Sequence, residues 1–321
     1  MNILKPSFYF GSTGILFLKL ISDKRINLDE FDKSLSELDK TDYSFSRGIS
    51  GIGWAMQILI ENDCLSKKYN VLLESFDDLI YKDVVNKKNY ALSMFSKNSL
   101  LGKALYLYQR ITSSPNKIIG FYNNVACKEC LVLLISEISS VISVIIENNK
   151  QSKILYTNPI YFLEIGQGFL FLYLCFRANI SKDFISKKLR YLKSEIESLL
   201  IDKTIVINNE NASYYFYLLY TYAHVATDIK DSGMVNNSRI IYHKLIPTLQ
   251  LFWIDITDFE LKKRLDIKIG ICDKTTVDQN LYRNDIDTPF YLWNKLSHNL
   301  SNQGIEYNPS KAQLLKAFLL E

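Results

Sequence analysis

Short apolar segments that open with glycine constrain the fold of this 321-residue chain more than any other feature of its sequence. Four of them begin near Gly11, Gly48, Leu101 and Gly166, and each is apolar on nearly every side. A helix of that kind has to be buried. Because glycine costs a helix interior about 1 kcal/mol relative to alanine, its recurrence at these places predicts close approach of one helix backbone to another.

Amphipathic stretches with charged faces alternate with these buried segments. One is predicted to begin at Asn27 or Asp29, and a second is predicted to begin at Ser181 with Phe184 on its apolar face. Only 6 prolines and 12 glycines occur, and β-type alternation is rare, so helices are expected throughout. Buried helices alternating with amphipathic ones predict an all-α fold of two concentric helical rings, an α/α toroid. Without a Pro/Gly/Ser-rich linker, a single domain over residues 1–321 is expected, with the last third the most divergent.

The charge balance and the apolar runs narrow the classes of partner and location. Lys and Arg total 38 against 34 Asp and Glu, and the excess is spread along the chain, so no nucleic-acid partner is expected. The apolar runs at 130–134, 138–146 and 169–176 are short or interrupted, which predicts no membrane span. No signal-peptide pattern follows the N-terminus, so a cytoplasmic protein with reduced thiols is expected. Cys127 and Cys130 form a C-x-x-C without a second pair and are interpreted as thiols stacked on a helix.

Two motifs resemble those of a known family. The stretch from Ser44 to Trp54 reads Ser-Phe-Ser-Arg-Gly-Ile-Ser-Gly-Ile-Gly-Trp and resembles the G-x-x-G-I-G-W signature of the lanthionine synthetase C-like cyclases. The other glycine-led segments occur in that family's order, and Gly-Ile-Cys272-Asp273-Lys274 resembles its late G-x-C-H-G zinc motif. The resemblance implies an α/α toroid linked to the modification of ribosomally made peptides. Cyclases of this family make thioether rings by adding a peptide cysteine to dehydroalanine or dehydrobutyrine.

The residues that such a cyclase needs are largely replaced here. Zinc held by two cysteines and one histidine would activate the substrate thiol. The family's first zinc cysteine is met by Asn-Asn-Glu-Asn at 208–211, and the second motif keeps Cys272 but has Asp273 in place of histidine. Glu164 stands where the family has its acid/base histidine. The resemblance therefore implies a catalytically impaired, zinc-less member for which no cofactor is expected.

Several residues remain candidates for a site. Glu164, at the start of a buried helix, could act as an acid if burial raises its pKa, or could be a solvated residue stabilised by the helix dipole. Cys272, Asp273 and His224 are the residual metal candidates, and His224 could instead interact with a helix dipole. Tyr215, Tyr217 and Tyr222 could line a peptide-binding cavity or could simply pack between helices.

Two functions remain open from the sequence. The first is a cyclase-like pseudoenzyme that binds a precursor peptide or a peptide-modifying partner enzyme. The alternative is an active thioether cyclase with an unorthodox zinc site built from Cys272, Asp273 and His224. A metal-free form of this alternative would use Glu164 and Asp273 as a carboxyl pair.

Overall fold

The computed structural model describes residues 28–249, except for 46–47, 62–64, 87–93, 95–98, 114–120, 153–154, 156–157, 203–204 and 209–210. Every regular element within the described residues is a helix, which confirms the predicted all-α class. The segment that begins near Gly11 lies outside the described residues, and so do Cys272 and Asp273. The described residues fall into two compact units, divided inside helix α6 between Ile138 and Ser139. The prediction of one domain over residues 1–321 stays a prediction.

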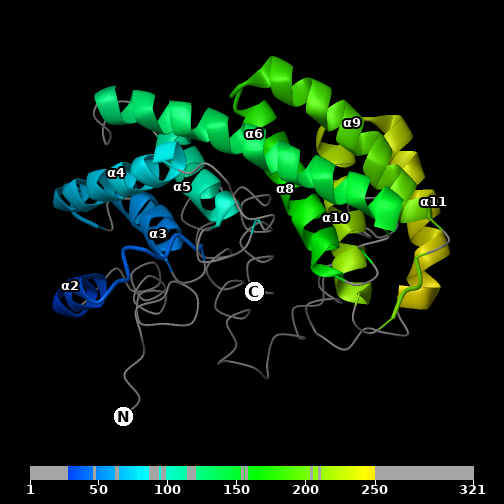
Figure 1. Ribbon diagram of the computed structural model, residues 1–321, viewed down its shortest axis with the longest axis horizontal. Helices are drawn as coiled ribbons and strands as arrows, with labels where there is room; N and C mark the ends of the chain where they lie inside the picture. The colour runs from blue at the N-terminus through cyan, green and yellow to red at the C-terminus, as the bar shows by residue number, and fades with distance from the viewer. Residues whose placement is uncertain are drawn as a thin grey trace, which may run out of the picture. The chain divides into compact units, whose positions relative to one another are not determined.

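Figure 1 shows the described helices in their order along the chain. Unit 1 contains α2 (Leu28–Ser36), α3 (Ile49–Glu61), the 3-10 helix η1 (Lys67–Tyr69), α4 (Asn70–Asn86), α5 (Leu100–Thr112) and the first part of α6 (Phe121–Ser152). Unit 2 contains the rest of α6, then α8 (Ile160–Arg177), α9 (Lys182–Ile201), α10 (Ala212–Asp228) and α11 (Ser232–Leu249).

Side-chain caps and apolar patterns explain where the helices lie. Ser99 caps α5 by accepting a hydrogen bond from the backbone N–H of Gly102 at 2.9 Å. Every residue of α3 from Ile49 to Ile60 is buried, as expected for a helix that is apolar all round. In contrast, α9 buries only one face, and its charged side chains are exposed or half-buried. The alternation of buried and amphipathic helices predicted from the sequence is therefore present in the described residues.

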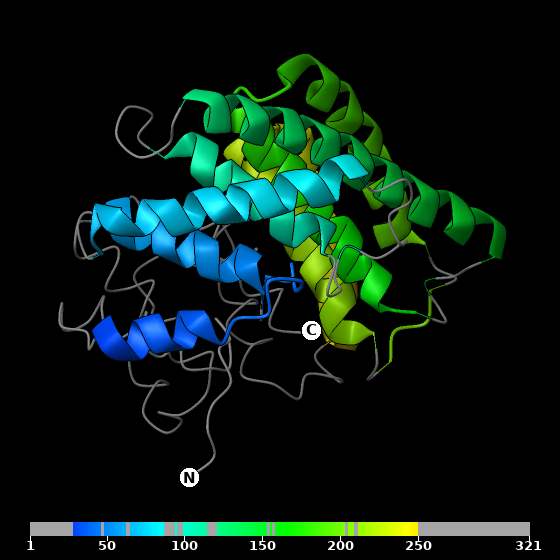
Figure 2. The ribbon, with the colours of Figure 1, turned by 60° about the vertical axis from the view of Figure 1, so that its left-hand side comes forward.

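In unit 1 two buried helices run parallel and are joined by an amphipathic helix that runs the other way. Gly53 of α3 faces Tyr106 of α5, and one turn later Gln57 bonds Arg110, so α3 and α5 share a direction. Helix α4 runs antiparallel to α5, because its earlier residue Asp77 bonds Arg110 and its later residue Asp83 bonds Lys103. Figure 2 shows α4 alongside α3.

Unit 2 repeats this arrangement with different residues. The Phe162 ring of α8 contacts Tyr215 of α10, and further along the same two helices Arg177 pairs with Asp228, so α8 and α10 run parallel. The connecting helix α9 runs antiparallel to α10, because its later residue Leu200 meets Tyr215 and its earlier residue Glu197 meets Tyr222. Each unit thus contains two parallel buried helices joined by an antiparallel outer one.

Glycine permits the close approach within each parallel pair. A Cβ atom on Gly53 would lie 2.5 Å from Cε2 of Tyr106, which is far inside van der Waals contact. In unit 2 a Cβ atom on Gly166 would lie 3.0 Å from Oγ1 of Thr221 and 3.4 Å from the Tyr217 ring. The glycines at these two positions therefore make room for side chains of the neighbouring helix. The close approach of two helix backbones that the sequence suggests stays a prediction.

Two helices are long and apolar enough to cross a membrane when judged by length and composition alone. They span Asn123–Gln151 in α6 and Ile160–Arg177 in α8. Core helices of soluble proteins pass the same test, and 78% of the α8 window and 56% of the α6 window are buried in the protein. The expectation of no membrane span stays a prediction.

Candidate functional site

The predicted acid Glu164 lies in the second turn of α8 and is 1% exposed. Successive residues of an α-helix are about 100° apart, and Gly166 faces α10. The Glu164 side chain therefore leaves α8 on the side away from α10, on the same face as Gln167. Gln167 is fully buried, and within the described part of the chain neither polar atom of its side chain has a hydrogen-bond partner. The acid role of Glu164 stays a prediction.

His224 occupies the last turns of α10 and is 1% exposed. Its Nε2 lies 3.3 Å from Oδ2 of Asp228, one turn further along the same helix. Asp228 also lies 3.6 Å from the guanidinium of Arg177. These contacts orient the imidazole within the α8/α10 contact, whereas Glu164 points to the other side of α8. Among the residues that the structure describes, no group of three His, Cys, Asp or Glu side chains is placed to hold a metal ion.

The three tyrosines predicted to line a peptide cavity are buried in α10. The Tyr215 hydroxyl lies 2.8 Å from the carbonyl oxygen of Leu200, and the Tyr222 hydroxyl donates to Glu197 at 2.6 Å. Burial raises the pKa of each of these hydroxyls, with the Glu197 carboxylate adding to the effect on Tyr222. Tyr217 packs against Gly166 and its pKa is also raised by burial. These contacts give all three a packing role, and a peptide contact stays a prediction.

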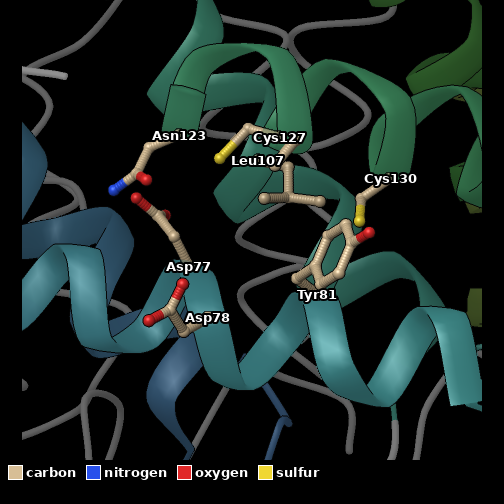
Figure 3. Close-up of a pocket in the computed structure, with 8 residues that line it drawn as sticks. Asp77, Asp78, Tyr81, Leu107, Asn123, Cys127 and Cys130 are labelled. Atoms are coloured by element: carbon tan, nitrogen blue, oxygen red, sulfur yellow. The ribbon is translucent and has the colours of Figure 1, made fainter. Parts of the chain in front are cut away.

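A cavity of about 180 Å³ opens on unit 1 between the outer helices α4 and α6 (Figure 3). Its lining comes from three helices and comprises Asp77, Asp78 and Tyr81 of α4, Leu107 of α5, and Asn123, Ala126, Cys127 and Cys130 of α6. The spacings 77, 78, 81 and 123, 126, 127, 130 are those of single helix faces, so two facing helices form the walls. Sequence reasoning missed this site because its polar residues come from separate helices with no motif.

A buried ion pair lies beside this cavity. Oδ2 of Asp77 accepts from Nη2 of Arg110 at 2.6 Å, and Oδ1 accepts from the Tyr106 hydroxyl at 2.7 Å. Arg110 also donates to Oε1 of Gln57 at 2.6 Å, and its side chain is fully buried. Burial raises the pKa of the Asp77 carboxyl, although the hydrogen bonds from Arg110 act in the opposite direction. The charge of Asp77 is therefore balanced within the protein and is not available to a ligand.

The two cysteines of the cavity are buried thiols. Cys127 is 2% exposed and interacts with Asp77, and Cys130 is 1% exposed. Burial raises the pKa of Cys130 to about 11 and raises that of Cys127 still further. A reactive or metal-binding cysteine requires the thiolate, which these surroundings disfavour. Both side chains consequently act as apolar wall of the cavity, and both lie on one helix, α6, as the sequence interpretation had them.

Comparison of this chain with protein-family models, with curated proteins and with solved structures finds no match.

Proposed function

We propose that this chain is a divergent lanthionine synthetase C-like protein with an α/α toroid fold, and that it binds a precursor peptide or a peptide-modifying partner enzyme without zinc-dependent catalysis. In this proposal the parallel buried helices of both units belong to the inner ring. The amphipathic helices α4 and α9 belong to the outer ring. The protein works in the cytoplasm on ribosomally made peptides.

The observation that carries the proposal is the repeated arrangement of the two units. In each, a glycine on the first buried helix allows a parallel second buried helix to approach: Gly53 against Tyr106, and Gly166 against Tyr217. A toroid of helical hairpins needs this repeat, since each outer helix has to return the chain so that the next inner helix runs parallel to the last. The Gly48 to Trp54 motif, which supplies the resemblance, leads the first of these helices.

The segment where the family's first zinc cysteine would stand supports the absence of catalysis. Residues 208 and 211 are asparagines that bond each other's backbone: Asn208 Oδ1 accepts from the Asn211 N–H at 3.1 Å, and Asn211 Oδ1 accepts from the Asn208 N–H at 2.9 Å. Asn211 also donates from Nδ2 to the carbonyl oxygen of Val206. These side chains close the turn before α10 and are neutral amides, which are poor zinc ligands beside thiolate and imidazole.

Two measurements on the full chain test the proposal. The first is the zinc content of protein purified from zinc-supplemented medium, where well under one ion per chain is expected. The second mixes the protein with a dehydrated, cysteine-containing peptide, with and without added zinc, and follows both binding and free thiol. Binding with a dissociation constant in the micromolar range, about −8 kcal/mol, and no accelerated loss of thiol are expected.

The variant Cys272→Ala separates the proposal from the active cyclase. Stoichiometric zinc with thiol loss that disappears in Cys272→Ala would establish an unorthodox metal site and overturn the pseudoenzyme. Thiol loss that persists without zinc but disappears in Glu164→Gln would instead identify the metal-free cyclase. Absence of any binding to either peptide or modifying enzyme would remove the recognition role itself.

A further inference from the structure

The cavity between α4 and α6 joins an apolar interior to an exposed carboxylate at its edge, that of Asp78. Leu107 forms its floor, and Ala126 with the two protonated thiols of Cys127 and Cys130 forms one wall. Figure 3 shows the Tyr81 ring standing between the two helices beside Cys130. A volume of about 180 Å³ is many times the roughly 10–15 Å³ that a single water needs. The space therefore suits a small ligand such as a short alkyl chain.

The carboxylate that faces this space is Asp78. Its neighbour Asp77 also lines the cavity, but Arg110 and Tyr106 already bond both oxygens of Asp77. Asp78 is exposed at the edge of the lining, one turn before Tyr81. An amphipathic ligand binds such a site with its alkyl stem inside and its charged end at the water boundary. The charged end has to be positive, and the Tyr81 ring adds a face that attracts cations.

We propose that this cavity binds a primary alkylammonium group, with the unbranched alkyl stem against Leu107 and Ala126 and the ammonium at Asp78. Lysine side chains and free alkyl amines share this chemistry. If the source is a lysine of a peptide, the cavity is a subsite of the proposed peptide recognition and rests on that function. If the source is a free amine, the cavity is a separate small-molecule site.

The first experiment uses pentylammonium as the probe and 1-pentanol as a matched neutral ligand, titrated calorimetrically into the full chain. Six heavy atoms permit only weak binding, so a dissociation constant of about 1 mM is expected for the amine. The alcohol keeps the stem and loses the charge, and it should bind about three- to tenfold more weakly. Equal affinity of the two ligands would overturn the proposal.

Three variants locate the binding. Asp78→Asn should weaken the binding of pentylammonium about three- to tenfold and leave the affinity for 1-pentanol unchanged, because Asp78 is exposed and contributes only charge. Glu37→Gln removes the same charge from an exposed residue after α2 and should leave both affinities unchanged. Ala126→Leu should fill the cavity and weaken the binding of both ligands. Unchanged amine affinity in Asp78→Asn would overturn the site, and circular dichroism of each variant verifies the fold.

A final titration with Nα-acetyl-lysine methylamide distinguishes the two sources. Binding that weakens in Asp78→Asn as pentylammonium binding does would identify a lysine side chain as the ligand. Binding of pentylammonium without binding of Nα-acetyl-lysine methylamide would identify the cavity as a site for small amines. Precursor-peptide binding that stays unchanged in Asp78→Asn would leave the proposed function intact and show that the peptide does not use this cavity.

Discussion

Gly53 of α3 and the Tyr106 ring of α5 lie so close that a Cβ atom at position 53 would be 2.5 Å from Tyr106 Cε2. The ring has little freedom to move, because its hydroxyl lies 2.7 Å from Oδ1 of Asp77 and 3.0 Å from the carbonyl oxygen of Leu73. We expect Gly53→Ala to lower the free energy of unfolding by about 1–3 kcal/mol through overpacking. The urea midpoint measures this change.

Gly233→Ala is the matched control for that prediction. Gly233 is exposed in the first turn of α11, where the nearest atom to a new Cβ would be the Asp231 carboxylate at 3.3 Å. The contact requires the carboxylate to give by only a few tenths of an ångström, and alanine favours a helix over glycine by up to about 1 kcal/mol. No loss of stability is therefore expected. Equal changes in the free energy of unfolding for the two substitutions would show that the contact with Tyr106 does not govern position 53.

The buried Arg110 and Asp77 give a second prediction. Arg110→Met leaves the carboxylate of Asp77 buried without its partner and is expected to cost about 3–5 kcal/mol. In the double variant Asp77→Leu with Arg110→Met both charges are removed, and the cost should be well below the sum of the two single changes. Chemical unfolding of the four proteins of this cycle measures the coupling. Additive losses would mean that the two side chains do not stabilise each other.

The sequence predicts the helices of this chain much better than it predicts their side-chain network. Glycine followed by mainly apolar residues marks α3, α5 and α8, because only burial explains both features together. The burial of Arg110 gives no such signal, since an arginine in an otherwise apolar helix normally indicates an exposed face. Its partner Asp77 lies on a different helix, and only the packing of α4 against α5 brings the two together.

The candidate sites also depend on contacts between helices, which the sequence does not predict. Glu164 and His224 are both buried, which the sequence left open for Glu164 and did not address for His224, and helix rotation places them on different sides of α8. Spacing along one helix cannot fix that rotation, which depends on where Gly166 meets α10. The cavity lined by Asp78 and Leu107 was missed for a related reason, because a cavity between helices depends on their separation. Family motifs describe single segments and carry no such information.

Tyr222 provides a third prediction, in unit 2. Its hydroxyl donates to Oε1 of Glu197 at 2.6 Å and so links α10 to α9. Tyr222→Phe should cost about 1.5–3 kcal/mol, the usual range for a hydrogen bond to a charged group. Tyr191→Phe on the exposed side of α9 is the control and should change stability by less than about 0.5 kcal/mol. Thermal or urea unfolding measures both changes in stability. Equal changes in the two variants would show that the hydrogen bond to Glu197 does not stabilise the fold.

Asp231 gives the last prediction, a pH dependence. Its carboxylate accepts from Lys193 at 2.7 Å and from the Met234 N–H at 2.9 Å, where it caps the start of α11. These hydrogen bonds, that of Lys193 first, lower the pKa of the carboxyl. A lowered folded-state pKa adds stability that is complete above the unfolded pKa of about 3.9 and is lost as the pH falls through the folded pKa.

Asp231→Asn keeps a capping oxygen but removes the charge, and because the pair is partly exposed it should cost only about 0.3–1 kcal/mol at pH 7. That difference between wild type and variant should shrink steadily below about pH 4 in urea titrations. A difference that stays constant down to pH 2 would show that the charge of Asp231 does not stabilise α11.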